Sequence, residues 1–154
     1  MTLPARLPGD LLASVGGALP EAGEWYPVHQ LLTAGPDDGA PAVCLLSRAE
    51  VRATPETVSV AARSSRAAAN LALTGAATLV AWAGKPHYVT LRLRDTVTPR
   101  EGVRGYLFDV AGVRIDDIGI EMRPLEYRME AWLAAAERWE TTSAVLDELA
   151  ARIG

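Results

Sequence analysis

Apolar and polar residues alternate over several short stretches of the chain, and this pattern predicts β-strands. It is clearest in Pro86–Arg94, PHYVTLRLR, where valine or leucine occupies every second position from Val89 to Leu93. Because consecutive side chains of a strand point to opposite faces, we expect one face of this segment to be buried and the other to contact water. The same reasoning predicts strands at Trp25–Ala34, Ala42–Arg48, Thr57–Arg63 and Ala77–Ala83. It also predicts strand structure over Arg104–Val110 and Val113–Met122, and these two segments form either a hairpin or one strand bent around Gly112.

Turn-forming residues separate these strands at regular intervals. The sequence GPDDGAP, Gly35–Pro41, is typical of a hairpin connection, Thr54–Glu56 contains a proline, and Gly84-Lys85 divides the next pair of strands. Several short strands with this spacing indicate a small closed barrel or a sandwich. The paired acids Asp37-Asp38 are interpreted as solvated turn residues rather than as a metal site or an acid/base pair.

Helical patterns lie at both ends of the chain and once in its middle. Asp10 is expected to cap a short N-terminal helix, and Ser64–Gly75 is expected to be a helix that follows the third strand. Leu125–Trp139 carries apolar residues at helical spacing, and Thr141–Ser143 offers an N-cap to a final helix. The apolar stripe of Leu125–Trp139 is expected to pack on the strands, with a dimer interface as the alternative.

Composition excludes several classes of protein. Hydrophobic residues make up 49% and charged residues 22% of the 154, which is typical of a folded soluble domain. The formal net charge of −4 argues against a general nucleic-acid binder, which needs a basic face. A single cysteine, Cys44, excludes a disulfide framework and a cysteine-based zinc site.

The sequence contains no pattern that predicts membrane insertion or export. The first ten residues, MTLPARLPGD, lack a charged start followed by an apolar run, and no window approaches 18 apolar residues. We therefore expect a cytoplasmic protein without a membrane partner.

Side-chain catalysis has few candidates in this sequence. The only histidines, His29 and His87, stand in no recognisable catalytic context, and no ligand spacing for a metal occurs. Asp116-Asp117 is an acidic pair, but adjacent strand residues point to opposite faces and cannot easily share a proton or a metal. The catalytic residues stay unassigned, and no metal site is expected.

The segment Arg63-Ser64-Ser65-Arg66 is the strongest chemical signal in the chain. It lies where a predicted strand ends and a predicted helix begins. A helix start offers unpaired backbone N–H groups and the positive end of its dipole, and arginine forks match phosphate oxygens. The segment is therefore competent to hold a phosphomonoester. The simpler alternative, a serine N-cap with solvated arginines, stays open.

The order of these elements resembles the FMN-binding split-barrel family that includes pyridoxamine 5'-phosphate oxidase. In that family a strand leads into Ser-Arg-Lys at the start of a helix, and an "ASLVFYW"-like strand follows. Here Ser65-Arg66 matches the Ser-Arg, Asn70-Leu71 the helix body and Ala77–Trp82 the next strand, and the similarity runs over about Val28 to Asp95.

The resemblance implies a mostly β (α+β) fold: a six-stranded antiparallel split β-barrel with a short N-terminal helix, one helix after the third strand and C-terminal helices. We expect one domain over 1–154, divided into an N-terminal helical segment (1–24), the barrel (25–123) and the C-terminal helices (124–154). In the family FMN lies at a homodimer interface, so the resemblance also implies a homodimer.

The resemblance further implies roles for individual residues. Ser65 and Arg66 would contact the FMN phosphate, with Arg63 and Ser64 beside them. Four more residues would lie along the flavin ring or face it: Val60, Ala61, Ser47, which ends the strand matching the family's Leu-Leu-Lys, and Tyr88, which matches a glutamine.

Three departures from the family pattern bear on function. The lysine after Ser-Arg is Ala67 here, the lysine ending Leu-Leu-Lys is Ser47, and the arginine that begins that strand is Ala42. Charge-assisted hydrogen bonds each contribute about 1.5–3 kcal/mol, so these losses reduce the expected FMN affinity. The oxidase's C-terminal substrate motif, with Trp and Arg-x-His, is also absent.

The sequence therefore favours an FMN-binding flavoprotein, an oxidoreductase of unknown small-molecule substrate that is not pyridoxamine 5'-phosphate oxidase itself. The flavin would carry the redox chemistry, which accounts for the lack of a catalytic side chain. The alternative is a non-enzymatic split-barrel dimer whose flavin site has decayed, or a carrier of another cofactor such as haem or F420. A nucleic-acid partner is not expected.

Overall fold

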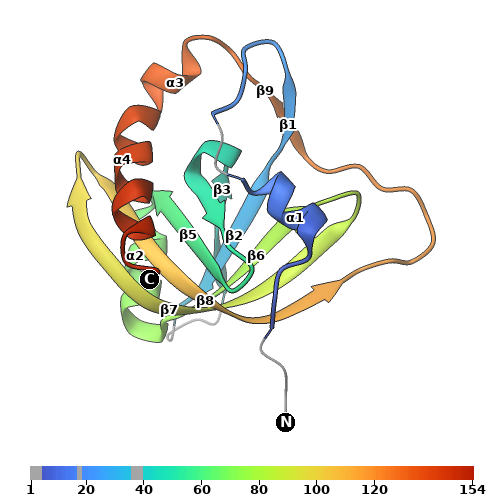
Figure 1. The fold of residues 1–154 in the computed structure, drawn as a ribbon, viewed down its shortest axis with the longest axis horizontal. Helices are drawn as coiled ribbons and strands as arrows, with labels where there is room; N and C mark the ends of the chain where they lie inside the picture. Colours follow the sequence, from blue (N-terminus) through green and yellow to red (C-terminus); the bar gives the residue numbers. More distant parts are fainter. Residues whose placement is uncertain (1–4, 17–18, 36–39) are drawn as a thin grey trace.

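A curled antiparallel sheet forms the body of the protein (Figure 1). The computed structural model describes residues 5–16, 19–35 and 40–154, and the Asp37-Asp38 turn lies outside them. Within these ranges seven strands pair in the spatial order β3-β2-β6-β7-β8-β5-β4. They are β2 (His29–Ala34), β3 (Pro41–Leu46), β4 (Val51–Ala53), β5 (Thr57–Ala62), β6 (Ala76–Trp82), β7 (Pro86–Arg100) and β8 (Val103–Ile115).

The two edge strands of this sheet are consecutive in the chain. Only Ser47 and the short 3-10 helix η1 (Arg48–Glu50) separate the end of β3 from the start of β4. A five-residue step spans at most about 18 Å, so the sheet must curl until its edges approach each other. The mostly β class is confirmed, and the expected six strands are corrected to seven because β4, only three residues long, is too short to show a periodic pattern.

The expected strand Trp25–Ala34 is divided in the structure. Its first part, β1 (Trp25–Pro27), leaves the main sheet and pairs with β9 (Glu126–Arg128), while β2 begins at His29. Pro27 has no N–H to donate to a ladder, and the N–H of Val28 donates to the carbonyl of Leu125 instead of to a neighbour in the main sheet. The division therefore lies at a proline, where strand pairing is weakest.

The inner face of the curled sheet encloses the main hydrophobic core. Alternate residues of every long strand contribute to it, among them Leu31, Leu79, Leu91 and Phe108, all at most 1% exposed. The short helix α1 (Gly9–Ser14) adds Leu11 to this core. The expected N-terminal helix is confirmed, although Pro8, not Asp10, is its N-cap.

Helix α2 (Ser65–Thr74) follows β5 as expected and packs Ala67 and Leu71 on the sheet. Ser64 is its N-cap, and Gly75, at φ 63°, is its C-cap in the left-handed conformation that glycine adopts at little cost. Both ends match the expected Ser64–Gly75 boundaries to within a residue. A serine and a glycine at these positions are the local signals that fix a helix.

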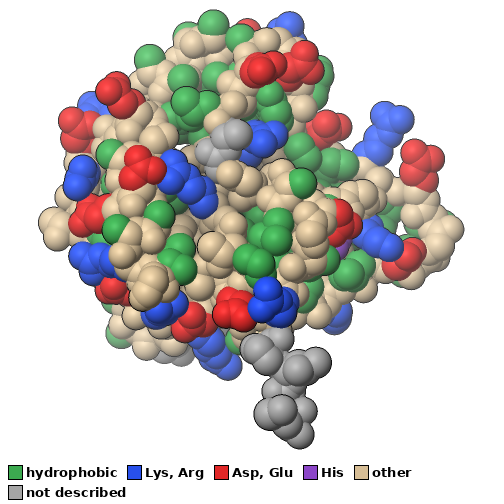
Figure 2. Space-filling view, viewed as in Figure 1, with side chains coloured by type: hydrophobic (Ala, Val, Ile, Leu, Met, Phe, Trp, Pro, Cys, Tyr) green, Lys and Arg blue, Asp and Glu red, His purple; other side chains and the backbone are tan. Residues whose placement is uncertain are grey.

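Helix α4 (Trp139–Ala150) covers the outer face of β5, β7 and β8. Val145, Leu146 and Leu149 are fully buried there against a second cluster that includes Ala61 and Leu107. All six residues of β5 are consequently buried, because one of its faces lines the core and the other lies under α4. Acidic and basic side chains alternate along the left side of Figure 2, where Figure 1 places α4 and the β7–β8 hairpin.

The expected helix over Leu125–Trp139 is wrong. The segment contains β9 and the single-turn helix α3 (Leu133–Ala136), and Trp139 already belongs to α4. Arg138 has φ 52° and ψ 48°, a left-handed conformation that no continuous α-helix can include. The final helix therefore begins at Trp139, two residues before the expected cap region of Thr141–Ser143.

The stretch from Arg104 to Met122 also differs in detail. It contains one strand, β8, rather than a hairpin, and the register shifts opposite Thr90 and Leu91, beside Gly112. The bent-strand alternative is thus the right one, although the strand ends at Ile115 and not at Met122.

No helix in the described residues is both long and apolar enough to cross a bilayer.

Candidate functional site

The junction of β5 and α2 carries the segment singled out in the sequence. The Ser64 hydroxyl accepts a hydrogen bond from the Ala67 N–H at 3.1 Å, and the Ser64 carbonyl accepts one from Ala68. The N–H groups of Ser65 and Arg66 have no acceptor among the described residues. Ser64 is therefore a helix cap, while two backbone donors stay available at the positive end of the helix.

Arginine side chains surround this junction without acidic partners. Arg63 and Arg66 are exposed, and neither forms an ion pair within the described part of the chain. Arg104 on β8 lies opposite Ala62, the last residue of β5, and is also exposed without an ion pair there. We call Arg63, Ser65, Arg66 and Arg104 the α2 anion site. Its geometry suits a phosphate or a carboxylate.

Ser47 lies in a different hollow, which we call the Ser47 pocket. Its volume is about 280 Å³, and η1, β3 and the C-terminal segment enclose it. Ser47 and Glu50 form a capping box, in which Ala49 N–H donates to Ser47 Oγ at 3.2 Å and Ser47 N–H donates to Glu50 Oε1 at 3.0 Å. The other lining residues are Val28, Leu45, Leu46, Tyr127, Leu133, Glu137 and Trp139.

Two buried donors on the wall of the Ser47 pocket have no hydrogen-bond partner among the described residues, the Tyr127 hydroxyl and Trp139 Nε1. Burial raises the pKa of Tyr127 to about 12, and the nearby Ser47 hydroxyl opposes this rise without reaching hydrogen-bond geometry. Buried polar groups are nearly always hydrogen-bonded, so two unpaired donors on residues that line a hollow indicate a place where a ligand's acceptors could bind.

The charge of Arg63 links the α2 anion site to the Ser47 pocket. Burial raises the pKa of the Glu50 carboxyl, the hydrogen bonds from Ser47 lower it, and Arg63 exerts a smaller lowering effect. Arg63 acts in the same direction on the pKa of Glu101. The guanidinium of Arg63 is therefore close enough to act on acids on both sides of the junction, although it pairs with neither.

The remaining predicted contacts lie elsewhere. Val60 is 0% and Ala61 1% exposed, the first inside the core and the second under α4, so neither side chain reaches a surface of the chain. Tyr88 pairs with Arg114 on β8, ten residues beyond Arg104 on the same strand. Ten residues correspond to roughly 33 Å along a strand. The structure thus brings Ser65, Arg66 and Arg63 together and places Tyr88 far from them.

Tyr88 has its own set of contacts. Its hydroxyl donates to Asp116 Oδ2 at 2.9 Å, and the Arg114 guanidinium lies 4.9 Å from the ring centroid. Asp117 pairs instead with Lys85 at 2.8 Å. The two acids of the Asp116-Asp117 pair therefore bind separate partners, although both follow the end of β8 at Ile115 and are not strand residues as expected.

Neither histidine is placed for acid–base work on a substrate. His87 is 1% exposed, and its Nδ1 lies 2.9 Å from the carbonyl of Lys85. His29 is 0% exposed, and burial lowers its pKa, so its neutral form is favoured. In the described ranges no group of three histidine, cysteine, aspartate or glutamate side chains could hold a metal ion.

Four residues of these sites were not found from the sequence. Glu50 could have been, because SRAE, Ser47–Glu50, has the spacing of a capping box. Tyr127, Trp139 and Arg104 carry no such local signal, since tertiary packing alone brings them to the Ser47 pocket and the α2 anion site.

Comparisons with known proteins identify the fold. No family model matches the chain, and no curated protein matches it. The flavin reductase of styrene monooxygenase from Pseudomonas putida S12 superposes with a TM-score of 0.52 at 14% identity, covering 66% of this chain and 86% of its own. A Shewanella frigidimarina protein with a split-barrel domain, provisionally named a flavin reductase, superposes with a TM-score of 0.50 at 10% identity, over 69% and 83%. The likeness shows a shared split-barrel fold.

Proposed function

We propose that the protein binds FMN and serves as a flavin-dependent oxidoreductase. The observation that carries this proposal is the α2 anion site. Within the described part of the chain, the N–H groups of Ser65 and Arg66 have no acceptor and the arginines beside them have no acidic partner. Two proteins with the same fold are named as flavin reductases, which supports the choice of cofactor. The missing oxidase motif argues for a substrate other than pyridoxamine 5'-phosphate.

The Ser47 pocket is the proposed place for the flavin ring. Trp139 Nε1 and the Tyr127 hydroxyl are unpaired donors there, and the polar edge of a flavin ring presents carbonyl oxygens that accept hydrogen bonds. A hollow of about 280 Å³ is smaller than the roughly 300–1,000 Å³ that encloses a drug-sized ligand. It would therefore hold the ring alone, and the ribityl phosphate would extend outward toward Arg63 and the α2 anion site.

The protein would contribute binding and orientation to the reaction. When bound, the flavin supplies hydride or electron transfer. Arg63 and Arg66 would neutralise the phosphate, and Arg104 adds a cation to a site in which Ala67 replaces the family's lysine. Leu133 and Trp139, together with the apolar residues of β3, would exclude water from one side of the ring.

The first test is the visible spectrum of the purified protein, followed by titration with FMN and with riboflavin. Riboflavin lacks the phosphate, so the ratio of the two affinities isolates the contribution of the α2 anion site. We expect the wild type to prefer FMN and Arg66→Ala to lose about tenfold or more of that preference, as for a charge-assisted hydrogen bond. The control is Arg92→Ala, which removes an exposed arginine of β7 that forms no ion pair with any residue the structure describes.

Two outcomes would contradict the proposal. Protein that is colourless as purified and takes up neither FMN nor riboflavin would exclude a flavin site. An FMN preference that Arg66→Ala leaves unchanged would exclude the α2 anion site as the phosphate contact.

A second candidate is the same fold as a non-catalytic dimer or as a carrier of haem or F420. It is favoured by Ala42, Ser47 and Ala67, which replace three cations of the flavin-binding pattern. Val43 and Leu45 on the edge strand β3 are each 56% exposed and would suit a homodimer contact. A haem or F420 spectrum would favour the carrier, and light scattering at micromolar concentration would give the mass of a dimer.

A further inference from the structure

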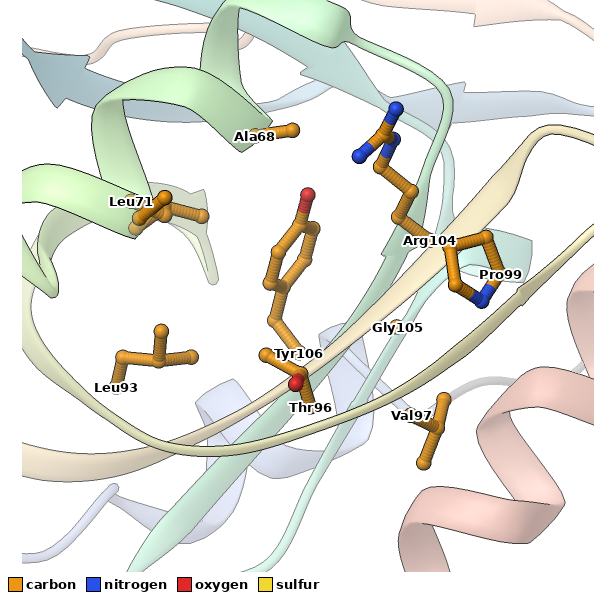
Figure 3. Close-up of a pocket in the computed structure, with 10 residues that line it drawn as sticks. Ala68, Leu71, Leu93, Thr96, Val97, Pro99, Arg104, Gly105 and Tyr106 are labelled. Carbon is orange, nitrogen blue, oxygen red and sulfur yellow. The ribbon is translucent and has the colours of Figure 1, made fainter.

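A second cavity lies beneath α2, on the inner side of the β7–β8 pair (Figure 3). Its volume is about 250 Å³, and we call it the Tyr106 pocket. It shares no lining residue with the Ser47 pocket. Its walls include Ala68, Leu71, Leu93, Val97, Arg104 and Tyr106.

The Tyr106 hydroxyl has no hydrogen-bond partner in the described chain, although the residue is only 6% exposed. In Figure 3 the ring stands in the centre of the cavity and its hydroxyl points between Ala68 and Arg104. A phenol buried in this way costs free energy that a phenylalanine would not, and an unpaired buried hydroxyl therefore calls for an explanation. A ligand acceptor that enters the cavity and reaches the hydroxyl once the Arg104 side chain has moved would satisfy it.

Arg104 is the only charged side chain among the described residues that line the cavity, and none of these residues is acidic. Its guanidinium extends to the same side as the Tyr106 hydroxyl in Figure 3. Burial raises the pKa of Tyr106 while the charge of Arg104 opposes the rise, which places the two groups within electrostatic range. A single arginine without an ion pair matches one negative charge on a ligand.

The rest of the wall is largely apolar and restricts the ligand's size. Leu71, Leu93 and Val97 provide aliphatic surface, and Ala68 on α2 has too small a side chain to fill the space above the phenol. A cavity of about 250 Å³ lies below the range for drug-sized molecules, roughly 300–1,000 Å³. The ligand must therefore be small and mainly apolar.

We propose that the Tyr106 pocket binds a small monocarboxylic acid with an apolar body, of the size of phenylacetate. The carboxylate pairs with the Arg104 guanidinium and accepts a hydrogen bond from the Tyr106 hydroxyl, while the body lies against Leu71, Leu93 and Val97. Arg104 is a long, exposed side chain, so changes of rotamer open a path to the phenol.

The test is calorimetric titration of the full chain, without flavin, with phenylacetate and with its uncharged methyl ester. We expect phenylacetate to bind one to one and the ester to bind at least about tenfold more weakly, because the charge-assisted bond is lost. Arg104→Gln should reduce phenylacetate affinity about tenfold, and Tyr106→Phe about threefold to tenfold. Arg92→Gln, on the same strand as Leu93 but exposed, should bind like the wild type.

Tyr106→Phe also gives a readout that a purely structural role would not. Since it removes a buried hydroxyl without a partner, the melting temperature of the free protein should stay equal or rise while phenylacetate affinity falls. The variant therefore remains folded and testable.

Several results would overturn the proposal. The first is that neither phenylacetate nor hexanoate, an aliphatic monocarboxylate, binds at millimolar concentration. The second is that phenylacetate and its methyl ester bind equally well. The third is that neither Arg104→Gln nor Tyr106→Phe changes the affinity for phenylacetate. Displacement of phenylacetate by stoichiometric riboflavin, which lacks the phosphate that would compete for Arg104, would assign the cavity to the flavin ring instead. Because the titration uses no flavin, failure of FMN binding alone leaves its result intact.

Discussion

Arginines on the two sides of the β5–β8 pair differ in whether they form ion pairs within the chain. On the α4 side, Arg52 pairs with Asp147 at 2.6 Å and Arg100 pairs with Glu148 at 3.0 Å, so positive charge is neutralised within the chain. On the α2 side, Arg66 and Arg104 form no ion pair in the described residues. Arginines of the first kind pair with acids of α4, and arginines of the second kind stay available to a ligand.

Successive residues of β8 divide between these two sides. A Cβ built on Gly105 would point toward α4 and lie 2.6 Å from Val145 Cγ1, so Gly105 lines the cavity beneath α2 with its backbone alone. Arg104 and Tyr106 line that cavity with their side chains. Alternation along a strand thus separates a structural face from a candidate ligand face by a single position. The difference shows that packing density, as well as charge, distinguishes the two sides.

Removing an anchor of α4 should have the largest effect on stability. Leu146 is 0% exposed between α4 and the sheet, so Leu146→Ala should lower the free energy of unfolding by about 2–5 kcal/mol. Leu73 on α2 is 69% exposed, so Leu73→Ala should change the free energy of unfolding by less than about 0.5 kcal/mol. Urea denaturation measures the free energy of unfolding of both variants, and equal losses would contradict the role of Leu146 as a buried anchor of α4.

Adding a methyl group at Gly105 should test the close contact itself. The new Cβ would meet Val145 Cγ1 at 2.6 Å and Val97 Cγ2 at 2.7 Å, so Gly105→Ala should cost about 1–3 kcal/mol through overpacking. Gly112→Ala, whose Cβ would have ordinary 3.8 Å contacts with Thr90, is the control. In the double variant with Val145→Ala, the loss should be smaller than the sum of the two single losses, and strict additivity would exclude this contact as the cause.

The buried carboxyl of Glu50 should make the stability of the protein depend on pH. Burial raises the pKa of its carboxyl in the folded protein, so the folded state binds more protons than the unfolded state between the two pKa values. Stability should therefore fall as pH rises from about 4.3, the ordinary value, through the raised one. Glu50→Gln does not titrate and still accepts the Ser47 N–H bond, so its stability relative to wild type should increase over this range. Parallel pH curves for the two proteins would refute the prediction.

The smallest effect is expected from a single ion pair on the α4 side. Arg100 and Glu148 are partly exposed, so Arg100→Gln should cost less than about 1 kcal/mol, and added salt should reduce the difference from wild type. Arg92→Gln provides an unpaired arginine of the same strand for comparison. A loss of several kcal/mol at Arg100 would mean that the ion pairs, rather than the buried leucines and valine, hold α4.

Local signals explain which parts of this fold could be predicted. Ser64 and Gly75 mark the ends of α2, and the alternation in Pro86–Arg94 marks β7, because caps and strand periodicity act over a few residues. The Leu125–Trp139 segment could not be predicted in this way. Its apolar spacing suits a helix, yet pairing of β9 with β1 and the left-handed Arg138 override that preference.

The candidate site shows the same division. Arg63, Ser65 and Arg66 adjoin in the chain and could be recognised together, whereas Arg104 reaches them only through its place opposite Ala62 in the β5–β8 pair. Tyr106 and Trp139 became candidates only once their burial without hydrogen-bond partners was visible. Such groups have no pattern in the sequence, since burial and pairing are properties of the folded chain.

The two edge strands also bear on aggregation. Open strand edges can recruit strands of other molecules, and a row of apolar side chains such as Val43 and Leu45 would encourage such growth. Here β4 is three residues long and β3 begins at Pro41, which has no N–H to offer a new neighbour. Because η1 also ties the two edges to each other, the chain has little continuous backbone on which a fibril could start.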